Sequence, residues 1–348
     1  MNEPRASRSC FGPGRVNLMG DHTDYNQGLA LPMAVDLGVA VTFDPWDEAR
    51  IDISSDAYPG EPASFPLDPD VESIQDLEPA WARLAAAVVS LARPELGGRF
   101  HIASSLPRGS GLSSSAAVAV ALAELCGVEG DALVVARLCQ AAEHRIGVPV
   151  GLLDPLVCAG GRAGQALRID FATLTTEPVT MAVDVECMVV DSGQRRDLRT
   201  SAYATRVAEC GAAAAVVGPL GLATEADIIG LRDPLLRRRA RHVVSECARV
   251  DAFARALSRG DLVGAGGVMD ESHRSLAEDF EATTPVIDEL TERVRSRPGV
   301  VGARMTGAGF GGCIVALAEP GTVDPASLDA PAWRVVPVDG TVARRKRG

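Results

Sequence analysis

The segment at residues 106–117, LPRGSGLSSSAA, most constrains the fold, because it lies between a strand-like pattern at 100–106 and a small-residue helical pattern at 114–126. Gly109 and Gly111 let the backbone turn sharply and approach a ligand closely. The helix that follows points unpaired backbone N–H groups toward the loop, and such a helix N-terminus binds anions. By itself, the segment is explained equally well as a flexible Gly/Ser loop before a serine-capped helix.

Charge and lysine content exclude several functional classes. A formal net charge of −12 repels nucleic acid backbones and anionic lipid surfaces, so we expect neither a nucleic acid partner nor a membrane. Lys346 is the only lysine in the chain. A Walker P-loop, a protein kinase and a pyridoxal-phosphate enzyme each need an internal lysine, so none of these classes fits.

The cysteines and the N-terminal residues indicate a cytoplasmic, soluble protein. The eight cysteines show no CxxC pair and no zinc-site spacing, so we expect free thiols in a reducing compartment. Residues 1–10 lack the apolar core of a signal peptide, and no apolar run approaches the roughly 18 residues of a membrane span.

The length of 348 residues exceeds what one core normally supports, and the patterns predict two α+β domains, at 1–176 and 177–348. Residues 59–78 read as a connection with little periodic signal. The expected strands lie at 39–44, 50–54, 100–106, 165–171 and 186–191, and a strand, glycine loop and strand at 299–318. The expected helices lie at 81–91, 114–126, 131–146, 200–215, 234–258, 261–279 and 285–297.

A second polar segment at residues 14–28, GRVNLMGDHTDYNQG, is dense in side chains that hydrogen-bond to hydroxyl groups. Planar polar groups recognise sugars, because each sugar hydroxyl donates and accepts at once. Asp21, His22, Asp24 and Asn26 offer such a network. For any one of these residues alone, a polar turn between two core segments is the simpler interpretation.

Two further features have ordinary alternatives. Residues 307–312, GAGFGG, satisfy the GxGxxG pattern, but strand-like sequence follows them, which argues against a dinucleotide site. Asp154 lies in an apolar segment, so it is functional, held by a partner such as Arg15, or a helix cap. Glu143 on a helical pattern is most often an exposed residue.

The three glycine- and serine-bearing segments lie in the chain in the order 14–28, 106–117 and 307–312. In this order they resemble the three motifs of the GHMP small-molecule kinases. Residues 14–28 resemble specifically the signature of the galactokinase family. The similarity continues through residues 140–144, the Asp154 segment, 191–206, 238–246 and 271–275, and so covers nearly the whole chain. The resemblance implies a two-domain GHMP kinase fold with the active site in the interdomain cleft. It also implies ATP and Mg²⁺, and phosphorylation of a sugar, galactose, at its anomeric hydroxyl.

The resemblance also implies roles for individual residues. Asp154 matches the catalytic aspartate and Arg15 its cationic neighbour, while Ser115 and Glu143 match the magnesium ligands. The sugar-contacting positions are Asp21, His22, Asp24, Gly151 and Tyr203. The positions on the ATP phosphates are Gly109, Ser110, Gly111, Leu112, Ser113, Ser114, Ser115 and Ala116.

Three departures from the family pattern bear on substrate choice and local geometry. Asp21 stands where the signature has glutamate, one methylene longer, at the far end of the sugar. Pro155 stands where glutamine usually follows the catalytic aspartate, and the interval from Glu143 to Asp154 is one residue shorter than usual. The N-terminal helix of the family is expected to be missing or much reduced.

Three hypotheses follow, and each predicts a different ligand response. The first is an active galactokinase. The second, motivated by Asp21 and Pro155, is a related anomeric sugar kinase with another sugar preference. The third is a non-catalytic sugar and ATP sensor, against which the intact SSAA stretch at 114–117 and Asp154 argue. In each case the partners are a small-molecule sugar and ATP, and we expect a monomer or a weak homo-oligomer.

Overall fold

The computed structural model describes residues 6–95, 97–107, 109–181, 185–195 and 202–346. A seven-stranded sheet occupies the first half, in the order β4-β3-β5-β2-β6-β7 with β1 paired on β2. Its strands are β1 (Arg8–Met19), β2 (Leu29–Trp46), β3 (Arg50–Ser55), β4 (Ala63–Pro66), β5 (Gly97–Ser104), β6 (Gln165–Asp170) and β7 (Thr175–Thr180). All pairs are antiparallel except β3 with β5, which are parallel.

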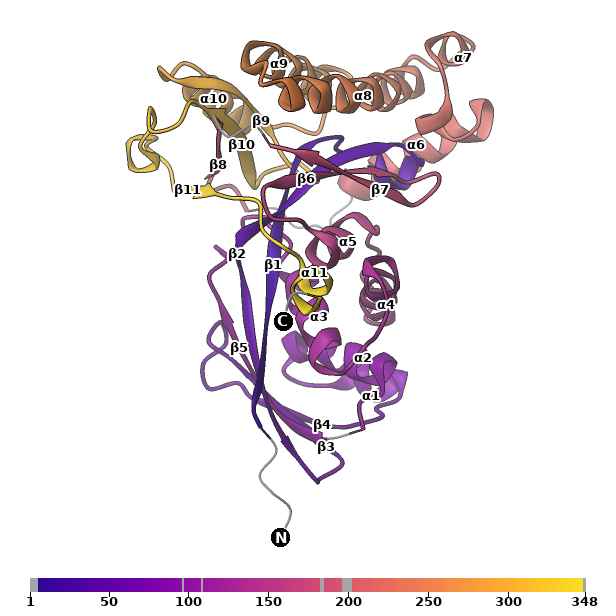
Figure 1. Cartoon of the computed structure of the whole chain (residues 1–348). Helices are drawn as coiled ribbons and strands as arrows, with labels where there is room; N and C mark the ends of the chain where they lie inside the picture. The colour runs from indigo at the N-terminus through magenta and orange to yellow at the C-terminus, as the bar shows by residue number, and fades with distance from the viewer. Residues whose placement is uncertain (1–5, 96, 108, 182–184, 196–201, 347–348) are drawn as a thin grey trace.

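Helices gather on one side of this sheet (Figure 1). They are α1 (Val71–Asp76), α2 (Arg83–Ala92), α3 (Ser114–Leu125), α4 (Ala132–Arg145) and α5 (Leu153–Gly160). Helix α3 is rich in alanine and buries eight of its twelve residues, because small residues let it lie close against β1 and β2. The N-terminal end of α3 therefore lies directly beside β1.

The second half is a four-stranded antiparallel sheet, β11-β8-β10-β9, covered by long helices (Figure 1). The strands are β8 (Glu186–Asp191), β9 (Val300–Met305), β10 (Cys313–Ala318) and β11 (Ala332–Val335). The helices are α6 (Ala202–Val217), α7 (Glu225–Ile229), α8 (Pro234–Arg259), α9 (Leu262–Glu278) and α10 (Pro285–Arg295). Asp233 caps α8 and Gly260 ends it in a left-handed turn, so both ends follow ordinary capping chemistry.

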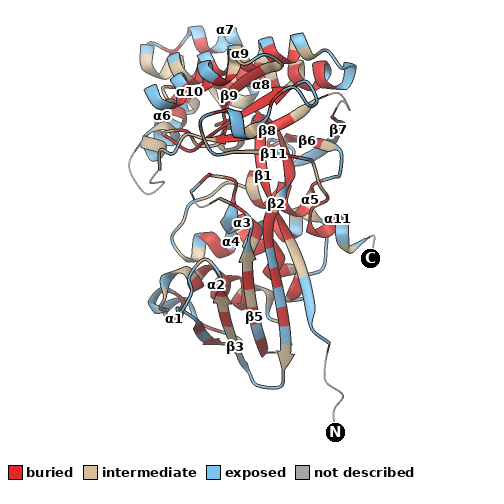
Figure 2. Cartoon of the chain, turned by 90° about the vertical axis from the view of Figure 1, so that its left-hand side faces the viewer, coloured by how far each residue is buried: buried red, intermediate tan, exposed pale blue. Residues whose placement is uncertain are grey.

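The two halves share buried contacts. Val250 and Phe253 of α8 belong to the same hydrophobic core as Val16 and Leu18 of β1, and Figure 2 shows buried residues continuing from one half to the other. After β11 the chain returns to the first half, where α11 (Thr341–Arg345) packs on α3, α5 and β1. Residues from both halves therefore meet near the ends of β1 and β2.

Most expected elements are confirmed. The strand–loop–strand unit at 299–318 is β9 and β10. All eight cysteines are free, as expected. The part of the chain that the structure describes contains no helix long and apolar enough to cross a membrane. The start of the helix expected at 200–215 lies outside the described residues, which show α6 from Ala202 onward.

One expectation is wrong, and one stays a prediction. Residues 59–78 are not a plain connection, because they contain β4 and α1. Strand β4 alternates buried Ala63 and Phe65 with exposed residues, but four residues are too few to give a clear pattern. The domain boundary at 176 stays a prediction. Residue 176 lies in β7, and the described chain changes sheet between Thr180 and Glu186.

Candidate active site

Asp154 and Arg15 form the centre of the candidate site. The Arg15 Nε donates to Asp154 Oδ1 at 2.7 Å and its Nη2 to Asp154 Oδ2 at 2.9 Å. Such a two-bonded pair fixes the orientation of the carboxylate. The Arg15 side chain is 9% exposed and that of Asp154 is 35% exposed, so Asp154 still faces solvent. The expectation that Arg15 holds Asp154 is therefore confirmed.

The same arginine ties the aspartate to the glycine- and serine-rich loop. Arg15 Nη1 donates to the Gly111 carbonyl at 2.7 Å, and its backbone N–H donates to the Leu112 carbonyl at 3.1 Å. Ser113 donates its hydroxyl to Asp154 Oδ2 at 2.5 Å. Asp154 at the start of α5 and the loop before α3 are thus one hydrogen-bonded unit.

Two glycines of β1 make this close approach possible. A β-carbon at Gly14 would lie 2.8 Å from the Leu112 carbonyl oxygen, and one at Gly12 only 2.0 Å from that of Ala117. Real β-carbons do not approach backbone oxygens so closely, so only glycine fits there. Ser113, at the N-cap of α3, has a φ of 63°, in the left-handed region that few residues other than glycine adopt.

The loop residues differ in exposure. Ser114 and Ser115 in the first turn of α3 are exposed, whereas Ser110, Leu112, Ser113 and Ala116 are buried. Ser115 hydrogen-bonds to Glu143 of α4, and this bond opposes the effect of burial, which raises the pKa of Glu143. The negative charge of Asp154 also raises that pKa. A cation bound here would favour the ionised form of Glu143 and so lower its pKa.

Asp24, Gly151 and Tyr203 come together from separate parts of the chain. A β-carbon at Gly151 would lie 2.2 Å from Asp24 Oδ2, so the Asp24 carboxylate packs directly on this glycine, three residues before Asp154. Burial, followed by the negative charge of Asp154, raises the pKa of Asp24 to about 6. Burial together with the Asp24 and Asp154 charges also raises the pKa of Tyr203. The Tyr203 ring lies 5.8 Å from that of His22, so residues of both halves of the chain meet here.

His22 is buried in an aromatic cluster. Its ring lies 4.4 Å from that of Phe280 and 5.8 Å from that of Tyr203, and its Nδ1 is 3.0 Å from the Tyr25 hydroxyl. Burial lowers the pKa of His22 to about 3, so the imidazole is neutral at pH 7. Its Nε2 has no hydrogen-bond partner among the described residues, which leaves it able to serve a hydroxyl group.

Asp21 differs from its neighbours in the same segment. It is 4% exposed, and Arg304 donates to its Oδ2 at 2.6 Å. Asn17 and the backbone N–H of Gly307 both donate to Oδ1, at 2.8 and 2.9 Å. The Asp21 carboxylate therefore points to the third glycine segment and to β9.

Two residues of this region were missed by the sequence analysis. Arg195 reaches the loop from the second half, since a β-carbon at Gly109 would lie 2.3 Å from its Nη1. Phe280 lies between the His22 and His242 rings, at 4.4 and 4.6 Å. Neither residue lies in a local sequence pattern that indicates a functional site. Only the fold brings them to residues 22 and 109.

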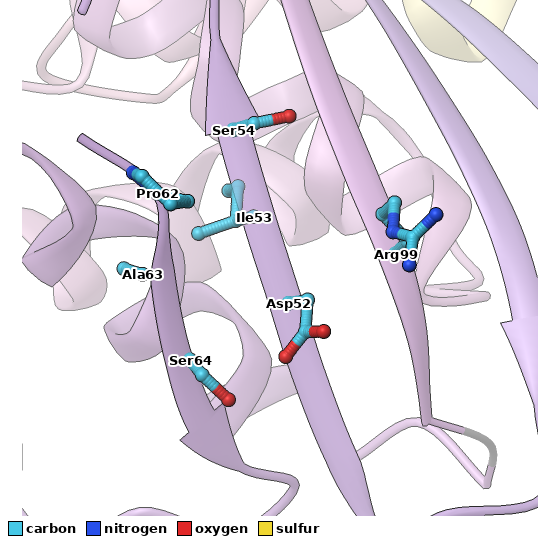
Figure 3. Close-up of a pocket in the computed structure, with 7 residues that line it drawn as sticks. All are labelled: Asp52, Ile53, Ser54, Pro62, Ala63, Ser64 and Arg99. Atoms are coloured by element: carbon cyan, nitrogen blue, oxygen red, sulfur yellow. The ribbon is translucent and has the colours of Figure 1, made fainter. Parts of the chain in front are cut away.

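Two surface hollows lie away from this cluster. One, of about 300 Å³, lies on the outer face of the first sheet and is lined by residues of β3, β4 and β5 such as Asp52, Ser64 and Arg99 (Figure 3). The other, of about 190 Å³, lies between residues 191–193, residues 329–331 and the face of α10 that carries Val286, Glu289 and Arg293. Among the described residues no group of three or more His, Cys, Asp or Glu could hold a metal by itself.

Comparisons with known proteins were made on both sequence and structure. Residues 2–45 match the galactokinase galactose-binding signature, residues 81–162 the N-terminal domain of GHMP kinases and residues 253–331 the GHMP kinases C terminal family. Galactokinase of Canis lupus familiaris is 40% identical over 341 residues, covering 90% of this chain and 87% of that protein. Galactokinase of Mycobacterium tuberculosis is 42% identical over 326 residues, covering 89% of this chain and 88% of that protein.

Solved structures agree. The structure of Lactococcus lactis galactokinase complexed with galactose has a TM-score of 0.87 at 28% identity, covering 98% of this chain and 96% of that chain. Methanococcus jannaschii mevalonate kinase has a TM-score of 0.69 at 17% identity, covering 96% of this chain and 99% of that chain. The second likeness concerns the fold alone.

Proposed function

This chain belongs to the galactokinase family, with the two-domain α+β fold of GHMP kinases, and from that premise we propose that it transfers the γ-phosphate of ATP to the anomeric hydroxyl of galactose, at a site built on Asp154. The observation that carries the proposal is the joint hold of Arg15 and Ser113 on Asp154 beside the loop at 109–116. Phosphoryl transfer depends on in-line positioning and charge neutralisation, and this arrangement serves both.

Asp154 orients the acceptor hydroxyl and takes up its proton as the bond to phosphorus forms. Arg15 holds the carboxylate in one orientation through two hydrogen bonds and places a positive charge beside it. Since Arg15 also bonds the Gly111 carbonyl, the acceptor and the phosphate loop keep a fixed spacing. The N–H groups at the start of α3 then receive the ATP phosphates, with Arg195 near Gly109 as a further cation.

We assign the sugar side of the site to His22, Asp24, Gly151 and Tyr203. The absence of a side chain at Gly151 makes room for the Asp24 carboxylate, whose oxygens accept hydrogen bonds from sugar hydroxyls. Tyr203 comes from α6, so this part of the site joins the proposed domains 1–176 and 177–348. The site would therefore lie in the cleft between them.

Ser115 and Glu143 fit a magnesium site. Mg²⁺ prefers oxygen ligands and binds through one or two protein groups together with substrate phosphates, and a hydroxyl bonded to a buried carboxylate supplies such ligands. Bound there, Mg²⁺ would neutralise the charge on the β- and γ-phosphates. The Ser115 hydroxyl and the Glu143 carboxylate would hold the ion, and the ion would supply the positive charge that the phosphate oxygens need.

The experiment that tests this function measures ADP release from ATP and Mg²⁺ with galactose, talose, glucose, galacturonate, arabinose and N-acetylgalactosamine. We expect the highest kcat/KM with galactose and a product that carries phosphate on the anomeric carbon, identified by ³¹P NMR. Folded protein that binds galactose but releases no ADP would contradict the proposal and favour the sensor hypothesis.

A second candidate, an anomeric kinase with another sugar preference, is favoured by one observation. The Asp21 carboxylate is engaged by Arg304, Asn17 and Gly307 and so does not point to the other sugar-site residues. If another sugar in the panel exceeds galactose in kcat/KM by tenfold or more, about 1.4 kcal/mol of transition-state binding, this second function replaces the first.

A further inference from the structure

A buried cluster of four charged side chains lies behind the proposed sugar site. Arg304 of β9 and Glu246 of α8 have fully buried side chains, and that of Asp21 is 3% exposed. Arg304 Nη2 lies 2.6 Å from Asp21 Oδ2 and 3.5 Å from Glu246 Oε1. Arg249 Nε bonds Glu246 Oε2 at 2.7 Å, so two guanidinium groups balance two carboxylates.

The cluster also holds the backbone around Asp21. Arg304 Nη1 donates to the Leu18 carbonyl at 2.8 Å, and Glu246 Oε1 accepts from the Gly20 N–H at 3.0 Å. His242 of α8 lies with its Nε2 3.2 Å from the Asp21 carbonyl oxygen. Leu18, Gly20 and Asp21 are therefore each bonded to α8 or β9, directly before His22 and Asp24.

The Asp21 carboxylate is closed off from a ligand by burial. It accepts three hydrogen bonds from this chain, as Asp154 does, but the Asp21 residue is 4% exposed whereas the Asp154 side chain is 35% exposed. A sugar hydroxyl bonding to it would have to displace a charge-assisted bond from a fully buried arginine. Such bonds are among the strongest in proteins, and an arginine left unpaired in the interior is costly.

We propose that Arg304 is the positioning residue of the sugar site, and that Asp21 is its anchor and not a sugar ligand. Arg304 holds Asp21, and Asp21 places His22 and Asp24, so discrimination between sugars falls to His22, Asp24 and Tyr203. The proposal rests on the proposed galactokinase function. It adds that residue 21, where the family signature has glutamate, contributes to sugar affinity only through the loop that it fixes.

Arg304→Lys tests the positioning role. Lysine keeps the positive charge but cannot reach the Leu18 carbonyl and Asp21 together with one planar fork. We expect the KM for galactose to rise about tenfold, the KM for ATP to stay within about twofold, and kcat to change less than the galactose KM. Arg297→Lys is the matched control. Arg297 lies on the loop before β9 and makes a partly exposed ion pair with Asp329. Equal effects of the two substitutions, or equal changes in both KM values, would overturn the proposal.

A second experiment separates anchor from ligand. The kcat/KM of wild type, Asp21→Asn, Asp24→Asn and His22→Gln is measured with galactose and with galactose analogues that each lack one hydroxyl. An anchor acts on a hydroxyl only through the side chains that it places, so we expect Asp21→Asn to couple only to hydroxyls that also couple to Asp24→Asn or His22→Gln. Asp24→Asn should couple to at least one hydroxyl by about tenfold. A coupling of Asp21→Asn of about tenfold to a hydroxyl that couples to neither of the other two variants would identify Asp21 as a sugar ligand and refute the proposal.

The two proposals fail separately. Absence of wild-type turnover would contradict the function alone, whereas wild-type turnover with the wrong variant pattern would contradict only the anchor.

Backbone hydrogen exchange gives a readout that needs no activity and that remains available if Asp21→Asn does not fold. Arg304→Lys should speed exchange in residues 20–26 more than in residues 109–117, and Arg297→Lys should do neither. Equal protection of residues 20–26 in Arg304→Lys and wild type would overturn the positioning role.

Discussion

At the scale of single residues, the central feature is a set of two carboxylates, those of Asp154 and Asp24, whose surroundings differ. Asp154 is paired with Arg15, whereas burial and the Asp154 charge raise the pKa of Asp24 to about 6. Ionised Asp24 offers a sugar two strong acceptor oxygens, whereas protonated Asp24 keeps only its carbonyl oxygen as a good acceptor. Protonation at acid pH therefore competes with sugar binding, and the competition begins near pH 6.

The first prediction concerns this competition. Calorimetric galactose binding should weaken below pH 6, with Kd about tenfold higher at pH 5 than at pH 7.5, because protonated Asp24 loses an acceptor. In Asp154→Ala the neighbouring negative charge is gone, so the pKa of Asp24 falls and the weakening moves to lower pH. Affinity that stays constant down to pH 5, or a midpoint unmoved in Asp154→Ala, would show that Asp24 is not the group concerned.

At the scale of elements, the contact between β1 and the loop before α3 sets the spacing of the site. Gly14→Ala would place a β-carbon 2.8 Å from the Leu112 carbonyl and 2.7 Å from the Leu106 side chain. The strand and the loop must then separate. We expect a loss of about 1–3 kcal/mol in unfolding free energy and a higher KM for ATP, measured by urea titration and steady-state kinetics.

Gly211→Ala is the control for this second prediction. Gly211 lies within α6, where an added β-carbon meets nothing within 4 Å, so alanine should leave ATP binding unchanged and stabilise the helix by up to about 1 kcal/mol. If Gly14→Ala leaves both stability and the KM for ATP at wild-type values, the close packing of β1 on the loop does not set the spacing of the phosphate site.

The sequence alone predicts some of these elements and contacts and misses others. The strand, loop and helix around residues 106–117 and the pairing of Arg15 with Asp154 were predicted, because glycine, serine and buried-charge chemistry act locally or leave few candidate partners. The partner of Asp21 was not. Arg304 lies 283 positions away in an apolar strand, and no spacing links the two. Strand β4 was missed because it is short and pairs with β3 on only four residues.

At the scale of the whole molecule, buried histidines link stability to pH. Burial lowers the pKa of His22 to about 3 and those of His242 and His273 to about 4, whereas an unfolded chain protonates histidine near pH 6.5. Below pH 6.5 the unfolded state therefore binds more protons, so stability is lost as the pH falls toward 4. Asp24, with its raised pKa, opposes this loss by a smaller amount.

The third prediction follows from this linkage. The unfolding free energy from urea titration should be lower at pH 5.5 than at pH 7.5, by roughly 1 kcal/mol for each of the three histidines before the opposing carboxyl contribution. Replacing His273 by glutamine, which cannot be protonated, should reduce the pH dependence. Equal stability at both pH values, or a variant with wild-type pH dependence, would contradict the buried neutral state of these imidazoles.

The central claim is that Asp154, held by Arg15 and Ser113 beside the phosphate loop, makes this chain a galactokinase. The most direct test is single-turnover transfer of the ATP γ-phosphate to galactose by wild type and Asp154→Asn, with galactose affinity measured separately for both. The account predicts stoichiometric galactose 1-phosphate from wild type, and for Asp154→Asn a rate lower by about 10²–10⁴-fold with galactose affinity changed far less. Transfer by Asp154→Asn at the wild-type rate, or no transfer by wild type that binds both substrates, would contradict it.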